Sequence, residues 1–217
     1  MAVWVKICAN TNLEDALAAA EFGADAVGFV FAASKRQMTP EAVGRISARL
    51  PAGVERVGVF GARPAEEIAA AAKVAGLDAV QLHGGYDRAV SERLRELLGD
   101  RVALIQTVHW TIGEDAASEE RVRGELVGLG GERVLVDAKV GAASGGTGVS
   151  FDWERARGVL GGHPRLIVAG GLRPENVAEA VRVLRPWGVD VASGVESTPG
   201  RKDVEKVRKF IEFARAS

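Results

Sequence analysis

Two glycine turns near the end of the chain have the residue types and spacing that bind a phosphate group. Residues 166–172 read LIVAGGL and residues 189–196 read VDVASGVE, so each apolar run breaks into a glycine turn that leads toward a helix. Glycine lets backbone N–H groups approach an anion, and a helix start adds aligned donors. The same pattern also occurs where glycine only ends a helix or turns a sheet. Because the turns close consecutive repeated units, we expect one phosphate to be bound by both; the expected residues are Gly170, Gly171, Ser193 and Gly194.

Four further polar side chains follow apolar runs. Cys8 ends the first run, Arg36 lies in the loop after the second, His83 follows the fourth, and Asp137 ends the sixth. A thiol and a carboxyl that face each other across a phosphate site suit proton transfer. Each residue also has a structural interpretation: Cys8 as a small buried hydrophobe, Asp137 as a loop cap and His83 as a polar residue beneath a turn.

Metal and nucleophile motifs are weak. The three histidines are His83, His109 and His163; no pair has a helical ligand spacing, and the chain has no Cys-x-x-Cys and no Gly-x-Ser-x-Gly. The sequence therefore predicts no metal site, no cofactor and no serine nucleophile. The glycine-rich segment Gly141–Gly148 is predicted to be a mobile lid, with a plain linker as the alternative.

Apolar runs alternate with amphipathic segments along the whole chain. The motifs GADAV at 23–27, GLDAV at 76–80 and GVDVA at 188–192 each end a helix-like segment and open an apolar run. The expected strands are Val3–Cys8, Ala26–Phe31, Arg56–Phe60, Ala79–Leu82, Val102–Val108, Val134–Asp137, Leu166–Val168 and Val189–Ala192. The expected helices are Leu13–Glu21, Pro40–Leu50, Pro64–Ala75, Arg88–Leu98, Glu119–Leu129, Phe151–Leu160, Pro174–Leu184 and Val204–Ala214.

Eight strands alternating with eight helices predict an α/β fold, a closed (β/α)₈ TIM barrel in which residues 1–217 form a single domain. A doubly wound open sheet is the alternative, since periodicity alone does not prove closure. In a barrel the strand ends share one mouth, so Cys8, Arg36, His83 and Asp137 would lie together.

Composition points to a small-molecule partner. The formal net charge is −1 and the basic residues are scattered, which argues against nucleic-acid binding. A single cysteine allows no internal disulfide and fits a reducing compartment. The start of the chain lacks the pattern of a signal peptide, and no apolar stretch is long enough to cross a bilayer. We expect a soluble, cytoplasmic protein with no membrane partner, either a monomer or a homodimer.

Along nearly its whole length the sequence resembles the phosphoribosylanthranilate isomerases. Each matching stretch is short, but their order and spacing together are specific. The stretches are VKIC at 5–8, GADAVGFVF at 23–31, SKR at 34–36, QLHG at 81–84, VDAK at 136–139, GGTG at 145–148, AGGL at 169–172 and SGVES at 193–197.

The resemblance implies an Amadori rearrangement in tryptophan biosynthesis, from N-(5-phosphoribosyl)anthranilate to 1-(o-carboxyphenylamino)-1-deoxyribulose 5-phosphate. By position, Asp137 would be the general acid and Cys8 the general base, with a thiolate favoured by nearby cationic groups. Arg36 would bind the anthranilate carboxylate. His83 and the glycine turns would complete the binding site for the phosphoribosyl substrate.

The chain departs from the family pattern at Ala9-Asn10, where Gly-Ile usually follows the cysteine, and at Ala192, where serine is common. Ala9 therefore bears on the orientation of Cys8. Two rival functions are another phosphosugar isomerase or lyase on the same barrel, in which Lys6 is the candidate catalytic lysine, and a non-catalytic phosphoribosyl-binding protein.

Overall fold

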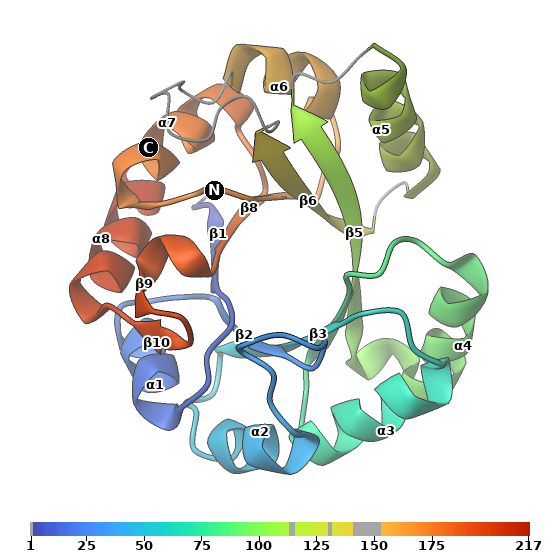
Figure 1. The fold of residues 1–217 in the computed structure, drawn as a ribbon, viewed down its shortest axis with the longest axis vertical. Coiled ribbons are helices and arrows are strands. Elements are labelled where there is room, and N and C mark those ends of the chain that lie inside the picture. The colour runs from blue at the N-terminus through green and yellow to red at the C-terminus, as the bar shows by residue number, and fades with distance from the viewer. Residues whose placement is uncertain (1, 113–115, 130–131, 141–152) are drawn as a thin grey trace.

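Eight parallel strands form a closed barrel in the order β1-β2-β3-β4-β5-β6-β7-β8 (Figure 1). The computed structural model describes residues 2–112, 116–129, 132–140 and 153–217. The barrel strands are β1 Trp4–Ile7, β2 Ala26–Val30, β3 Glu55–Phe60, β4 Ala79–Leu82, β5 Ala103–Ile112, β6 Arg133–Val140, β7 Leu166–Ala169 and β8 Gly188–Val191. The predicted barrel is confirmed, and the open-sheet alternative is wrong because β1 pairs with β8.

Helices surround the barrel on its outer side. In the described part of the chain the α-helices are α1 Leu13–Glu21, α2 Pro40–Ser47, α3 Ala65–Ala75, α4 Arg88–Leu98, α5 Ala116–Leu129, α6 Trp153–Leu160, α7 Pro174–Leu184 and α8 Val204–Arg215. Local sequence sets their ends: Asn12, Thr39, Asp87 and Asp203 accept backbone N–H groups as N-caps. No described helix is long and apolar enough to cross a bilayer.

Several element bounds differ from the sequence prediction by one to four residues; for example, α2 ends at Ser47 and not at Leu50, and α5 begins at Ala116 and not at Glu119. Strands β5 and β6 extend to Ile112 and Val140, beyond the predicted ends at Val108 and Asp137. Their ladder continues because alternate residues face opposite sides of the sheet, so a polar side chain facing inward does not end a strand. A small antiparallel pair, β9 Glu196–Thr198 and β10 Arg201–Lys202, was not predicted. The predicted lid at 141–148 lies outside the described residues.

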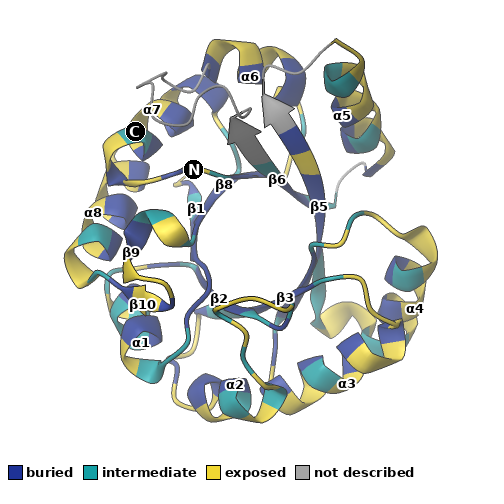
Figure 2. Cartoon of the chain, in the orientation of Figure 1, coloured by how far each residue is buried: buried dark blue, intermediate teal, exposed yellow. Residues whose placement is uncertain are grey.

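The core has two layers. Buried side chains fill the space between strands and helices, and Figure 2 shows the barrel strands coloured mostly as buried. A second cluster inside the barrel includes Val57, Ile105 and Ile167. Below that cluster, Trp4 stacks on Trp187 with ring centroids 5.1 Å apart. The Arg133 guanidinium lies over both rings, 5.8 and 5.2 Å from their centroids. The amino-terminal end of the barrel is thus filled by side chains.

The turns after β7 and β8 approach each other closely at Gly194. A Cβ at this position would lie 1.9 Å from the carbonyl oxygen of Leu172. No L-residue side chain fits there without a backbone shift. Gly194, which is predicted to contact phosphate, is therefore also needed for the close packing of the two turns.

Gly194→Ala is expected to lower the free energy of unfolding by about 3 kcal/mol, because the backbone at Leu172 must move. Gly171→Ala is the matched control, since its Cβ meets no described atom within 4 Å and only the φ of +64° is strained. That strain costs about 1 kcal/mol. Urea denaturation measures both variants, and equal losses would contradict the close approach.

Candidate active site

One cavity of about 770 Å³ opens at the carboxyl-terminal ends of the barrel strands. Its walls come from β2, β3, β4, β6, β7 and β8, from the segment that follows β1 and from other loops at this end of the barrel. The structure brings all eight sequence-predicted residues to this cavity: Cys8, Arg36, His83, Asp137, Gly170, Gly171, Ser193 and Gly194.

Cys8 follows β1 directly, and its side chain is only slightly exposed. The departure from the family pattern has a conformational consequence, because Ala9 adopts a φ of 62°, in the left-handed region that glycine adopts readily. The fully buried Asn10 supports this turn: its amide donates to the carbonyl oxygens of Ile7 at 2.8 Å and Gly28 at 3.2 Å. The chain therefore turns at Ala9 without a glycine.

A buried charge lies beneath the thiol. Lys6 is fully buried inside the barrel, donates to Gln81 Oε1 at 2.5 Å and forms an ion pair with Asp190 Oδ1 at 3.2 Å. Gly28 makes room for this arrangement, since a Cβ there would lie 2.6 Å from Cys8 Sγ and 2.8 Å from Lys6 Cε. The thiol of Cys8 and the ammonium of Lys6 are therefore neighbours inside the barrel.

Burial opposes the charge on Lys6, but the carboxylate of Asp190 and the neighbouring Cys8 raise the pKa of the ammonium above its ordinary value. A lysine that stays protonated is a poor nucleophile, because Schiff-base chemistry needs the free amine. The surroundings of Lys6 therefore do not support the alternative in which it is a catalytic lysine.

Burial raises the pKa of the Cys8 thiol, although Lys6 and Lys202 both act to lower it. The expectation that cationic groups favour the thiolate is thus only partly right: the cations are present, but the loss of hydration outweighs them. The two ammonium groups reduce the cost of forming a thiolate in this buried position.

Asp137 lies on β6 beside two histidines. Its Oδ2 lies 3.9 Å from Nε2 of His83 and 3.7 Å from Nδ1 of His109. His83 is part of the mouth, as predicted, and no hydrogen bond within the described residues holds its ring. The loop-cap interpretation of Asp137 has no support among the hydrogen bonds of the described residues.

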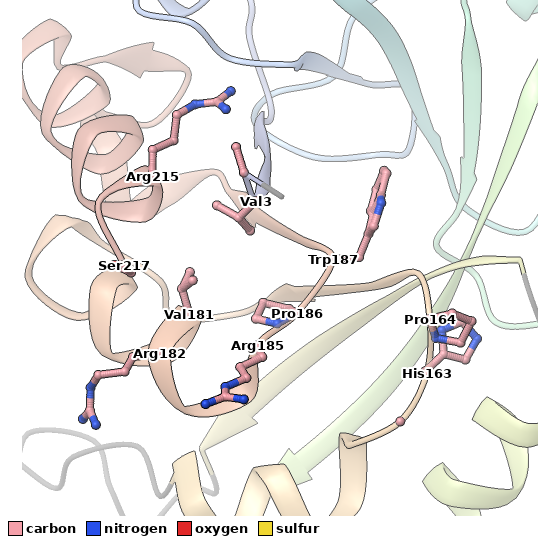
Figure 3. Close-up of a pocket in the computed structure, with 12 residues that line it drawn as sticks. Val3, His163, Pro164, Val181, Arg182, Arg185, Pro186, Trp187, Arg215 and Ser217 are labelled. Carbon is pink, nitrogen blue, oxygen red and sulfur yellow. The ribbon is translucent and has the colours of Figure 1, made fainter.

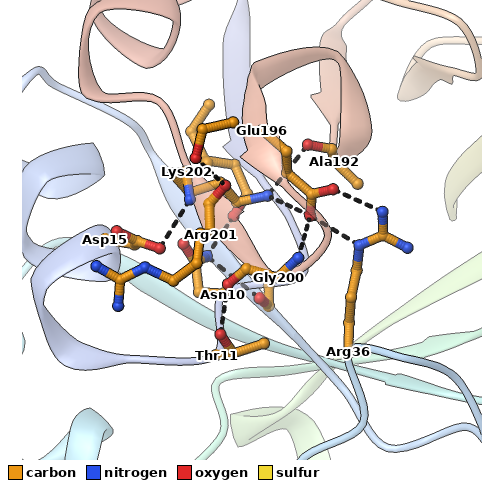
Figure 4. Close-up of polar contacts among 12 residues, drawn as sticks. Asn10, Thr11, Asp15, Arg36, Ala192, Glu196, Gly200, Arg201 and Lys202 are labelled. Carbon is orange, nitrogen blue, oxygen red and sulfur yellow. Dashed lines mark hydrogen bonds and ion pairs between the residues drawn. The ribbon is translucent and has the colours of Figure 1, made fainter.

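Arg36 is held by a carboxylate that sequence reasoning missed. Its Nε and Nη2 donate to Oε1 and Oε2 of Glu196 at 2.7 and 2.6 Å (Figure 4). Lys202 Nζ lies 3.5 Å from the same carboxylate, and the Gly200 N–H donates to it at 3.2 Å. Burial opposes ionisation of Glu196, but the bonds from Arg36 and the charge of Lys202 lower the pKa of this carboxyl below its ordinary value. The unpredicted β9–β10 pair therefore orients Arg36.

The glycine turn after β7 has the backbone conformation that its sequence predicts. Gly170 and Gly171 have φ angles of 90° and 64°. Asn176 at the start of α7 accepts the Arg173 N–H at 2.9 Å and donates to Gly171 O at 3.1 Å. These contacts fix the turn against the helix that follows it.

A second cavity of about 690 Å³ lies at the opposite end of the barrel (Figure 3). Val3, Pro164 and Trp187, which precede strands β1, β7 and β8, contribute to its lining. Its lining includes arginines but no thiol and no carboxylate side chain. It therefore lacks the acid and base groups of the first cavity.

The family model described as N-(5'-phosphoribosyl)anthranilate isomerase matches residues 5–213. The chain belongs to this family. An N-(5'-phosphoribosyl)anthranilate isomerase of Pelobacter propionicus is 42% identical over 97% of this chain and 95% of its own length. That of Thermotoga maritima is 42% identical over 98% of both chains.

Solved structures of phosphoribosylanthranilate isomerases have the same fold. The crystal structure from Thermotoga maritima superposes with a TM-score of 0.85 at 41% identity, covering 99% of this chain and 100% of that one. A second isomerase structure, in complex with reduced 1-(o-carboxyphenylamino)-1-deoxyribulose 5-phosphate, has a TM-score of 0.81 at 39% identity over 99% and 100% of the two chains.

Several polar residues of this family member were missed from the sequence. Asp190 lies in the middle of a predicted strand, Lys202 lies far along the chain from the mouth, and His109 was placed after a strand end. Period-two alternation could have found His109, since residues 105, 107 and 109 share a face of β5. No local pattern marks the Arg36–Glu196 pair, whose members are 160 residues apart.

The pKa of Cys8 is expected to lie above the ordinary value of a cysteine thiol, because the thiol is buried. Lys6→Met should raise it further, because the ammonium that lowers it is lost. Thiolate absorbance in the ultraviolet against pH measures this value directly, since Cys8 is the only cysteine. The Cys8→Ser variant is the reference, because subtracting its absorbance removes the contribution of Tyr86, the one tyrosine of the chain. An unchanged pKa in folded Lys6→Met would show that the ammonium does not act on the thiol.

Proposed function

We propose that this chain catalyses the Amadori rearrangement of N-(5-phosphoribosyl)anthranilate to 1-(o-carboxyphenylamino)-1-deoxyribulose 5-phosphate, a step of tryptophan biosynthesis. The observation that carries the proposal is a single cavity lined by a thiol, a carboxyl, an oriented guanidinium and two glycine turns, in a chain of this isomerase family. Acid, base and binding groups for the reaction are all present there.

Asp137 is proposed as the general acid. It gives its proton to the ribose ring oxygen, the C1–O bond breaks, and the nitrogen lone pair forms the C1=N bond of a protonated Schiff base. Its position at the mouth supports this role, since the side chain is reachable from the cavity and only 19% exposed.

Cys8 is proposed as the general base. Its thiolate takes the proton from C2, the C2–H electrons form a C1=C2 bond, and the C1=N π electrons return to nitrogen, which gives an enolamine that tautomerises to the ketone. Because burial raises the pKa of Cys8, the thiolate is a strong base once formed. Lys6 would stabilise that negative charge without taking part in the transfer.

Arg36 is proposed to bind the anthranilate carboxylate. Glu196 engages Nε and Nη2 of the guanidinium, so the Nη1 side remains for a second carboxylate. Gly170, Gly171, Ser193 and Gly194 are proposed to bind the phosphate through backbone N–H groups. Along the barrel, His83 after β4 lies beyond Asp137 on β6, on the side away from these turns. This order would place the ribose between Cys8 and Asp137.

The proposed reaction needs no cofactor, because both proton-transfer groups are side chains of the chain. We propose a small phosphoribosyl substrate as the physiological partner, without nucleic acid or membrane. A cytoplasmic location and a monomer or homodimer remain proposals; one structural relative from Thermotoga maritima is described as a dimeric isomerase from which monomers were made.

Cys8→Ala and Asp137→Asn are each expected to lower kcat by about 10²–10⁴-fold, because each removes one proton-transfer group. The assay generates the unstable substrate in situ and follows the loss of anthranilate fluorescence. Far-ultraviolet circular dichroism checks that both variants fold. Near-normal kcat in a folded variant would remove that residue from its assigned role.

Gly171→Val is expected to raise KM more than Ser193→Ala does. A side chain at Gly171 points into space that is otherwise open and strains a φ of +64°, whereas Ser193→Ala removes one hydroxyl and leaves the backbone donors in place. Inorganic phosphate should compete weakly with substrate in the wild type. An ordinary KM for Gly171→Val would mean that the turn serves chain geometry alone.

A further inference from the structure

Three side chains with metal-ligating atoms meet at the rim of the barrel. His83 follows β4, His109 lies on β5 and Asp137 lies on β6, and these three strands are neighbours. His109 and Asp137 are direct register partners in the β5–β6 ladder. The barrel therefore brings together two imidazoles and one carboxylate from three chain segments.

One ligand atom from each residue lies within 4.8 Å of the other two. Asp137 Oδ2 is central, 3.9 Å from His83 Nε2 and 3.7 Å from His109 Nδ1. In a tetrahedral zinc site with bonds of about 2.0–2.1 Å, ligand atoms are about 3.3 Å apart. Side-chain rotations that move the ligand atoms by a fraction of an ångström to about 1.5 Å would bring all three to this spacing around an ion.

The ring of His109 is already oriented for this purpose. Its Nε2 lies 2.9 Å from the backbone carbonyl oxygen of His83, which can only accept, so Nε2–H donates there and Nδ1 faces Asp137. A histidine that binds a metal commonly donates its second ring N–H in this way. The two rings meet edge to face, with centroids 4.7 Å apart and planes at 87°.

The cluster is accessible to solvent, and two of its members, His83 and Asp137, line the cavity. The side chains of His83, His109 and Asp137 are 38%, 43% and 19% exposed. No described hydrogen bond fixes the His83 ring, and its Nδ1 has no partner among the described residues. An incoming ion would therefore displace water rather than an existing protein contact.

We propose that His83, His109 and Asp137 bind one divalent cation of borderline softness, with Zn²⁺ as the best fit. Two imidazoles and one carboxylate are a recurrent zinc ligand set, and the open cavity leaves a fourth position for water. The proposal departs from the sequence prediction of no metal site, which considered only spacing along the chain.

The consequence for turnover rests on the proposed function. A carboxylate bound to a metal ion cannot hold the proton that the general acid must deliver. Zinc is therefore an inhibitor of this isomerase and not its cofactor, and a chelator such as EDTA restores activity. The site would make activity depend on the concentration of free zinc.

Cobalt(II) is the probe, because its visible d–d bands report coordination independently of activity. We expect the wild-type protein to bind one Co²⁺ per chain, with zinc displacing it. His109→Ala should weaken binding by more than about tenfold, since a ligand is lost. His109 has no assigned part in turnover, so this variant should keep its basal activity and lose sensitivity to zinc.

Two control variants make the assignment specific. His163→Ala removes a histidine from the other end of the barrel, and Cys8→Ala removes the thiol at the mouth. Both are expected to bind Co²⁺ like the wild type, without a thiolate-to-cobalt charge-transfer band in any protein that contains Cys8. A charge-transfer band that disappears in Cys8→Ala would overturn the proposed ligand set.

Failure of the site and failure of the proposed function give different results. No Co²⁺ uptake by the wild type, or equal uptake by His109→Ala, overturns the metal site and leaves the role of Asp137 untouched. Stoichiometric binding that His109→Ala abolishes, together with full activity of the zinc-loaded wild type, supports the site and overturns Asp137 as the general acid.

Discussion

The ion pair between Lys6 and Asp190 is the constraint on which the rest of the site depends. It joins the first and last strands of the barrel at register partners, so it exists only when the ring is closed. A charge buried in this place without a partner would cost several kcal/mol. Gln81 accepts a further hydrogen bond from the ammonium, and the Cys8 thiol, just after β1, faces Gly28 as Lys6 does. The electrostatic environment of the thiol therefore depends on closure of the barrel.

Much of the fold and part of the site could be predicted because their signals are local. Helices α1, α4 and α7 have the predicted bounds, and Cys8 and His83 follow strands β1 and β4 as predicted. Asp137 was found from the end of an apolar run, although β6 continues to Val140. The contacts that orient them could not be predicted. Glu196 reaches Arg36 from a hairpin that has only three and two residues in its strands, too short for a periodic signal.

The catalytic mouth combines rigid and locally strained backbone. Strand register places the side chains of Lys6, Asp137 and Asp190, whereas Ala9 and the glycine turn after β7 have positive φ angles. Strained conformations persist only where their surroundings fix them, and here the Asn10 side chain does so at Ala9. The site therefore has its least regular backbone next to its proposed base.

The stacked pair of Trp4 and Trp187 gives this barrel an internal optical reporter of ring closure. These indoles belong to the two ends of the chain, 183 positions apart, and they meet only when β1 docks beside β8. Contacts between such distant segments form late when loop-closure entropy governs folding. Near-ultraviolet exciton signals from this pair would therefore distinguish a fully closed ring from a folding intermediate in which the helices and most strands have already formed.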